Sequence, residues 1–167
     1  MSSILGIDPG STHTGYGIVS LGEGQPVYVA SGTITIPKGL ALARRLALIY
    51  EGLHQVVTKW CPKECAVEQV FLAKNVRSAL VLGQVRGVAL LAGVNEGLEI
   101  YEYSPLQIKQ AVVGYGKASK IQVIKMVKHI LNIESDLNTH EADALAVAVC
   151  HLNTRLSQKR WSLAKIQ

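Results

Sequence analysis

The sequence lacks the features of a membrane, secreted or modular protein. No apolar run of about 18 residues is free of charge, and no basic and then apolar leader stands at its start. Linker-like clusters of Gly, Pro and Ser are missing, and so are internal repeats. We therefore expect a soluble, cytoplasmic protein with a single domain over residues 1–157 and a flexible basic tail at 158–167.

Cysteine is also scarce, and its spacing excludes two kinds of site. The chain has only Cys61, Cys65 and Cys150. An odd number of cysteines does not form a disulfide framework, and the pair at 61 and 65 has no second pair that would complete a zinc site. We expect reduced thiols, with Cys65 and Cys150 packed in the interior.

Charge is present but unevenly placed. The net charge is +5, yet residues 104–133 contain five lysines and no acid, whereas residues 134–153 contain four acids and neither Lys nor Arg. A basic segment beside an acidic one predicts a polyanion bound near a metal site, because phosphates need cations and the metal needs carboxylates. The alternative is that the lysines only keep a helix face soluble.

Hydrophobic periodicity and turn residues predict an α/β domain. Strands are expected at 3–8, 14–20, 26–36, 65–70 and 98–103, the first three as an antiparallel meander. Helices are expected at 39–59, 75–95, 105–113, 120–131 and about 139–157. A crossover through the first helix would place strand 65–70 parallel to strand 3–8. The prediction is a mixed five-stranded sheet flanked by helices.

The helix at 75–95 is apolar around most of its circumference. One sheet face cannot cover so wide an apolar surface, so we expect part of it to pack against a second subunit. The residues of this apolar belt are Leu80, Val81, Leu82, Val88 and Leu91.

Several ionisable residues occur where buried elements are expected. Asp8 ends an apolar strand, Glu68 lies within another, and Asp143 lies in an alanine-rich helix one turn after His140. A charge in such a place is costly unless it is paired or binds an ion. Carboxylates with one imidazole suit Mg²⁺ or Mn²⁺, and two such ions catalyse phosphodiester hydrolysis.

Two of these residues also have a structural interpretation. Asp8 precedes a proline and can form a turn. A polar residue in a first helical turn, such as His140, often only complements the helix dipole.

Five short motifs are arranged in order along about residues 3–152. They are LGIDPGS with TGYG at 5–17, VEQVF with AKN at 67–75, GQVRG at 83–87, VVGYG at 112–116 and EADALA at 141–146. Together they closely resemble the RuvC family of bacterial Holliday-junction resolvases.

The resemblance implies an RNase H-like fold, a homodimer, and Mg²⁺-dependent paired nicking of four-way DNA junctions in homologous recombination and DNA repair. It also implies work alongside the RuvA–RuvB branch-migration complex. Asp8, Glu68 and Asp143 fall on the family's acidic catalytic positions. His140 stands where some members have aspartate, and it is expected as the fourth catalytic and metal-ligating residue.

The expected DNA contacts are one aromatic residue and several cations. Phe71, the only phenylalanine, falls where the family's motif has an aromatic residue near the junction centre. We expect it to stack on an unpaired base, with core packing as the alternative. The cations expected along the DNA backbone are Lys74, Arg77, Lys109, Lys117 and Lys120.

Two other functions share part of this pattern. An actin-like or sugar-kinase ATPase also begins with a strand, an aspartate and a Gly/Thr turn, but such proteins need two domains of this kind around a nucleotide. A non-catalytic junction-binding module would explain the basic segments and would leave Glu68 without a role.

Overall fold

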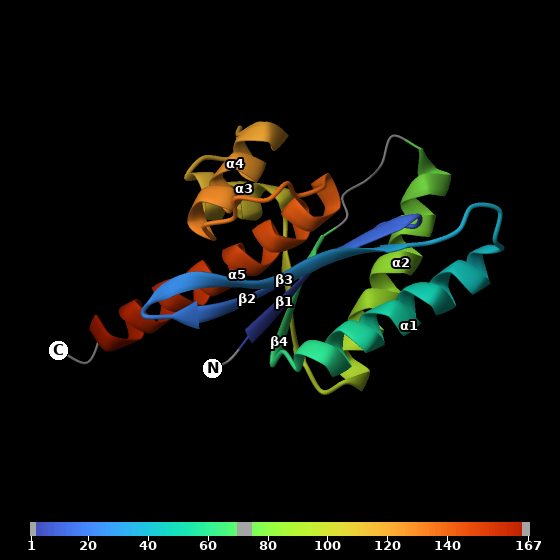
Figure 1. Cartoon of the computed structure of the whole chain (residues 1–167), viewed down its shortest axis with the longest axis horizontal. Coiled ribbons are helices and arrows are strands. Elements are labelled where there is room, and N and C mark those ends of the chain that lie inside the picture. The colour runs from blue at the N-terminus through green and yellow to red at the C-terminus, as the bar shows by residue number, and fades with distance from the viewer. Residues whose placement is uncertain (1–2, 70–74, 165–167) are drawn as a thin grey trace.

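A computed structural model describes residues 3–69 and 75–164, and its centre is a five-stranded sheet (Figure 1). The strands are β1 (Ser3–Asp8), β2 (His13–Gly22), β3 (Gln25–Thr35), β4 (Glu64–Glu68) and β5 (Glu99–Tyr103). Their order in the sheet is β3-β2-β1-β4-β5. β1, β2 and β3 form an antiparallel meander, and β4 is parallel to both β1 and β5. The predicted mixed sheet is confirmed.

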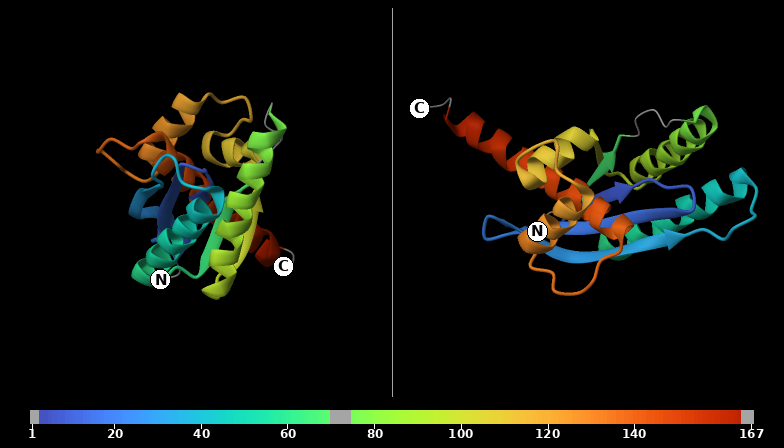
Figure 2. Two further views of the ribbon diagram at one scale, coloured as in Figure 1. Left: turned by 90° about the vertical axis from the view of Figure 1, so that its right-hand side faces the viewer. Right: turned by 90° about the horizontal axis from the view of Figure 1, so that it is seen from above.

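Helices cover both faces of this sheet (Figures 1 and 2). On one face, α1 (Leu42–Trp60) and α2 (Val76–Asn95) pack over apolar side chains of β1 and β4. On the other face, α5 (Thr139–Ala164) lies across the sheet, with α3 (Pro105–Val113) and α4 (Lys120–Ile130) beside it. Each face therefore has its own hydrophobic core. Cys65 and Cys150 are buried free thiols in these cores, as predicted.

Local sequence explains where three of the helices begin. Ser104 and Ser119 cap α3 and α4, each in a capping box with the glutamine three residues further on. The predicted capping box before α5 is also present, because Asn138 and Glu141 exchange two hydrogen bonds of 3.0 Å. These caps fix the first turns of α3, α4 and α5.

Glycines in β1 and β2 allow α5 to lie very close to the sheet. A methyl group on Gly6 would lie 2.1 Å from the carbonyl oxygen of Ala144, and one on Gly15 would lie 2.1 Å from the carbonyl oxygen of His140. No larger residue fits at these positions without moving the helix. The contact brings the first turn of α5 to the end of β1.

α5 is longer than the sequence predicted. It continues to Ala164 rather than ending near residue 157, so residues 158–164 are helical. The predicted end was wrong because the sequence after 157 has neither Gly nor Pro to stop the helix, and its change to polar residues does not break helical hydrogen bonding.

α2 leaves much of its apolar surface exposed. Its buried residues are Val85, Ala89, Ala92 and Gly93. Its apolar side chains that are more than half exposed are Val76, Leu80, Leu91 and Val94. By length and composition it is the one helix in the described ranges that is apolar enough to cross a bilayer, a criterion that core and interface helices also meet. Leu80 and Leu91 are thus the outermost members of the predicted apolar belt, whereas Val81, Leu82 and Val88 are half-buried.

Candidate active site

Two of the predicted acidic residues lie at the ends of neighbouring strands. Asp8 is the last residue of β1, and Glu68 is the last residue of β4. Because β1 and β4 pair in parallel, with Ile7 opposite Val67, both carboxylates lie at the same edge of the sheet.

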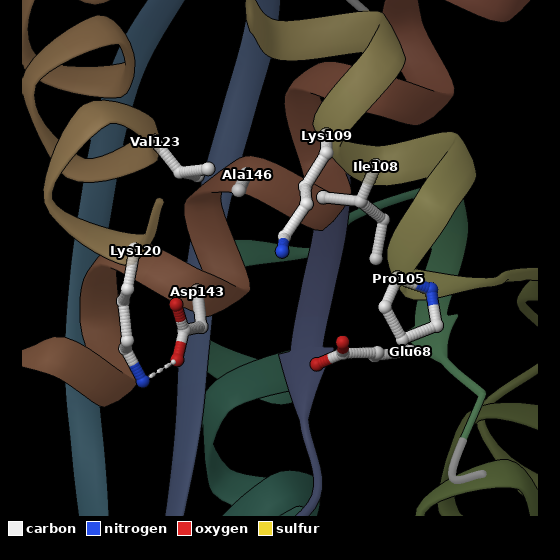
Figure 3. A pocket seen from close by; sticks show the side chains of 8 residues that line it. All are labelled: Glu68, Pro105, Ile108, Lys109, Lys120, Val123, Asp143 and Ala146. Carbon is white, nitrogen blue, oxygen red and sulfur yellow. Dashed lines mark ion pairs between the residues drawn. The ribbon is translucent and has the colours of Figure 1, made fainter. Parts of the chain in front are cut away.

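The first turns of α5 bring two more predicted residues to this edge. Nδ1 of His140 lies 3.1 Å from Oδ2 of Asp8. Asp143 follows on the same face of the helix and lines a cavity that Glu68 also lines (Figure 3). The structure therefore brings Asp8, Glu68, His140 and Asp143 together from three separate parts of the chain.

The cavity has a volume of about 210 Å³ and lies between the sheet and the first turns of α3, α4 and α5. Lys109 and Lys120 contribute its positive charge, and Figure 3 shows both side chains reaching into it. Nζ of Lys120 lies 2.6 Å from Oδ2 of Asp143. The site thus combines carboxylates with cations supplied by the basic segment.

Burial raises the pKa of two carboxyl groups of this site, those of Glu68 and Asp8. Burial, followed by repulsion from Asp8 and Asp143, raises the pKa of Glu68 to about 7. Burial also raises the pKa of Asp8, although its hydrogen bond with His140 opposes the effect. Carboxyl groups in this condition are stabilised by any cation that binds between them.

The donor set suits a hard divalent cation. Three carboxylates and one imidazole are ligands that Mg²⁺ and Mn²⁺ accept, with water and phosphate oxygens completing the shell. Among residues 3–69 and 75–164, no three acidic, histidine or cysteine side chains already stand close enough to hold an ion. Lys120 instead supplies the positive charge beside Asp143. This ion pair occupies Oδ2, one of the two carboxylate oxygens of Asp143.

The four other predicted DNA contacts differ in position. Lys117 is exposed in the loop before α4, and Arg77 is exposed in the first turn of α2. Phe71 and Lys74 lie outside the described residues.

The turn after β1 is held by Thr14 rather than by Asp8. The hydroxyl of Thr14 donates to the carbonyl of Gly10 at 2.8 Å. The side chain of Asp8 is directed to His140 instead. The interpretation of Asp8 as a turn-forming residue is therefore not supported.

Two residues next to the site, His13 and Arg45, were not predicted from the sequence. The ring of His13 stacks on the ring of His140. Arg45, on α1, donates from Nε and Nη2 to the carbonyl of Ser11 at 3.0 and 2.6 Å. Neither residue stands in a buried or periodic position, so only the folded structure reveals these contacts.

Comparison with known sequences identifies relatives over almost the whole chain. The family model described as "Crossover junction endodeoxyribonuclease RuvC" matches residues 4–151. A curated relative of that description from Hahella chejuensis is 52% identical over 160 residues, which cover 96% of this chain and 92% of the relative. Another, from Geobacter metallireducens, is 52% identical over 151 residues, which cover 90% and 92%.

Comparison with solved structures gives the same fold. RuvC of T. thermophilus in complex with a Holliday junction substrate matches with a TM-score of 0.87 and 31% identity, over 95% of this chain and 97% of that chain. The yeast mitochondrial Holliday junction resolvase matches with a TM-score of 0.71 and 17% identity, over 99% and 85%, which shows a shared fold alone. The RNase H-like fold implied by the sequence motifs is confirmed.

Proposed function

The chain belongs to the RuvC family of crossover junction endodeoxyribonucleases, and on this basis we propose that it resolves four-way DNA junctions by metal-dependent hydrolysis of phosphodiester bonds. The observation that carries the proposal is the convergence of Asp8, Glu68 and Asp143 beside Lys109 and Lys120. A module that only binds junctions would have no use for buried carboxylates, whose burial costs free energy. Family membership likewise favours a nuclease over an actin-like ATPase.

In this proposal the acidic side chains and His140 hold the metal. Asp8, Glu68, Asp143 and His140 are the ligands, with two Mg²⁺ ions in the reactive complex and Mn²⁺ as a substitute. When bound, the metal activates a water molecule for attack and stabilises the charge on the leaving 3′ oxygen.

The lysines bind and orient the DNA backbone. Lys109 and Lys120 place positive charge at the cavity. A DNA phosphate that approaches the carboxylates would be attracted by this charge. Lys120 pairs with Asp143. Once it leaves Asp143, the same ammonium group can contact the phosphate, so one movement exposes a ligand and supplies a DNA contact.

The protein is proposed to act as a homodimer of single domains in the cytoplasm. The exposed apolar side chains of α2, among them Leu80 and Leu91, provide a surface for the second subunit. A two-fold dimer places two identical sites about the two-fold axis of a junction, so two strands of like polarity can be cut symmetrically. The proposed partner is the RuvA–RuvB branch-migration complex.

A fluorescent four-way junction tests the assignment of the catalytic residues. Asp8→Asn, Glu68→Gln and Asp143→Asn should each reduce the cleavage rate by about 100-fold or more, because each removes a charge that holds the metal. Junction affinity measured in EDTA should stay within about threefold of the parent, because the lysine contacts remain. Cleavage at the parent rate by any variant would remove that residue from the site.

A further inference from the structure

The ring of His13 lies flat against the ring of His140. The two ring centroids are 5.3 Å apart and the ring planes differ by only 5°. This separation is within the range of offset-stacked aromatic pairs. His13 begins β2 and is exposed, whereas His140 lies in the first turn of α5 and is half-buried.

The backbone just before His13 is held by hydrogen bonds to other parts of the fold. Its Nδ1 lies 3.1 Å from the hydroxyl of Thr12. The carbonyl of Thr12 accepts a hydrogen bond of 2.9 Å from the backbone N–H of Ile36, and the guanidinium of Arg45 holds the carbonyl of Ser11. The backbone that carries His13 is thus tied to α1 and to the segment after β3.

His140 is constrained on its other sides as well. Its backbone carbonyl lies directly over Gly15, and its Nδ1 is held by Asp8 at 3.1 Å. Its side chain is nevertheless 38% exposed, so one hydrogen bond alone would leave the ring able to leave this orientation. The ring of His13, stacked on one face of the His140 ring, prevents the His140 ring from turning toward that side.

We propose that His13 is a positioning residue, whose ring stacks on His140 and fixes it in the orientation in which His140 and Asp8 take up the metal ion. The proposal rests on the metal-binding role of His140 proposed above. His13 itself does not bind the metal in this account. The energy of an aromatic stack corresponds to about a 2- to 12-fold change in an equilibrium constant.

Two variants of His13 and one control distinguish the role of its ring from that of its nitrogen atoms. His13→Ala removes the ring, His13→Phe keeps a flat ring without nitrogen, and His129→Ala removes an exposed histidine of α4 as a matched control. Binding of Mn²⁺ is measured by electron paramagnetic resonance on the DNA-free protein. The ring-proton NMR signals of His140 are followed in the metal-free protein, and the metal dependence of junction cleavage is recorded separately.

His13→Ala should weaken Mn²⁺ binding by about 3- to 10-fold. It should shift the His140 ring signals and raise the metal concentration for half-maximal cleavage, with kcat at saturating metal close to that of the parent. His13→Phe should restore Mn²⁺ affinity, and His129→Ala should change none of these quantities.

Two results would overturn the inference. One is unchanged Mn²⁺ affinity and unchanged His140 signals in His13→Ala. The other is His13→Phe behaving like His13→Ala, which would mean that His13 acts through its nitrogen atoms. If the parent protein binds Mn²⁺ and His13→Ala shows the expected loss of affinity and the expected shifts, but the parent cuts no junction, the nuclease proposal fails while the role of His13 stands.

Discussion

Glu68 is a carboxylate that the fold holds at a cost in stability. Its pKa rises from 4.5 in the unfolded chain to about 7 in the folded protein, mainly through burial. The folded state then binds the proton more tightly than the unfolded state does. Its relative stability is therefore greatest below pH 4.5 and falls as the pH rises through 7.

Replacing Glu68 by Gln should stabilise the protein at high pH. One pKa unit corresponds to about 1.4 kcal/mol, and after allowance for solvent screening we expect a gain of about 1–2 kcal/mol at pH 8 in EDTA, or about 2–8 °C in Tm. At pH 4 the two proteins should melt together. Thermal melts from pH 4 to 8 measure this difference. Glu51→Gln, at an exposed position of α1, is the control, and equal melting of Glu68→Gln and the parent at pH 8 would contradict the argument.

Lys109 and Lys125 offer a comparison of two lysines in the same basic segment. Lys109 lines the active-site cavity, whereas Lys125 lines a separate groove with Tyr115 and His129. Lys109→Ala should make the negative slope of log K against log salt shallower by about 0.9, because it loses one phosphate contact. Lys125→Ala should leave the slope unchanged. Fluorescence anisotropy with a labelled junction measures both. An unchanged slope for Lys109→Ala would mean that this lysine is only solvated.

Among the elements, β4, β5 and α5 are joined by a polar cluster in which Glu64, His151 and Tyr103 are buried and Arg155 is partly exposed. Glu64, at the opposite end of β4 from Glu68, lies with Oε2 2.6 Å from Nε2 of His151 and accepts a hydrogen bond from Arg155. The other ring nitrogen of His151 lies 2.7 Å from the hydroxyl of Tyr103. Each member satisfies a polar group that the interior would otherwise leave without a partner.

Removing Glu64 should therefore destabilise the fold strongly. Glu64→Ala leaves His151 and Arg155 without their acidic partner, and we expect a loss of about 3 kcal/mol, or about 6–12 °C in Tm. Glu99→Ala is a matched control, because Glu99 lies opposite Glu64 in the sheet but is exposed. It should change stability by no more than about 0.5 kcal/mol. Similar losses in both variants would show that the polar cluster contributes nothing special.

The secondary structure elements were largely predictable because their hydrophobic patterns and helix caps depend on residues that are close together in the sequence. The short apolar runs of β1 and β2, and the capping boxes at Ser104 and Ser119, each depend on a few consecutive residues. The close approach of α5 to the sheet was not predicted, although glycine within an apolar strand, as at Gly6, is a signal for it. The end of α5 was missed because no residue marks it.

The site was predictable in part for a related reason. Asp8, Glu68 and Asp143 stand out because each lies within or at the end of an apolar segment. The ion pair of Lys120 with Asp143 and the stack of His13 on His140 join residues far apart in the sequence. Such contacts depend on how whole helices and strands pack together, so no local sequence pattern predicts them.

At the scale of the whole molecule, the exposed face of α2 should determine the oligomeric state. Leu80→Glu places a charge on a side chain of the proposed interface that is 65% exposed, and should give monomers in sedimentation at micromolar concentration. Ile121→Glu, on α4, makes the same change at a side chain that is 66% exposed and should leave the dimer intact. A monomeric parent protein, or a dimeric Leu80→Glu variant, would refute the interface.

The most direct test of the central claim uses a supercoiled plasmid that extrudes a cruciform, which presents a four-way junction. With Mg²⁺ the parent protein should convert the plasmid to linear molecules whose nicks can be sealed by ligase, because two identical sites cut symmetric strands before the complex dissociates. EDTA or Glu68→Gln should abolish the product. Uncut plasmid despite junction binding, or linear product that persists in EDTA, would contradict a metal-dependent junction resolvase.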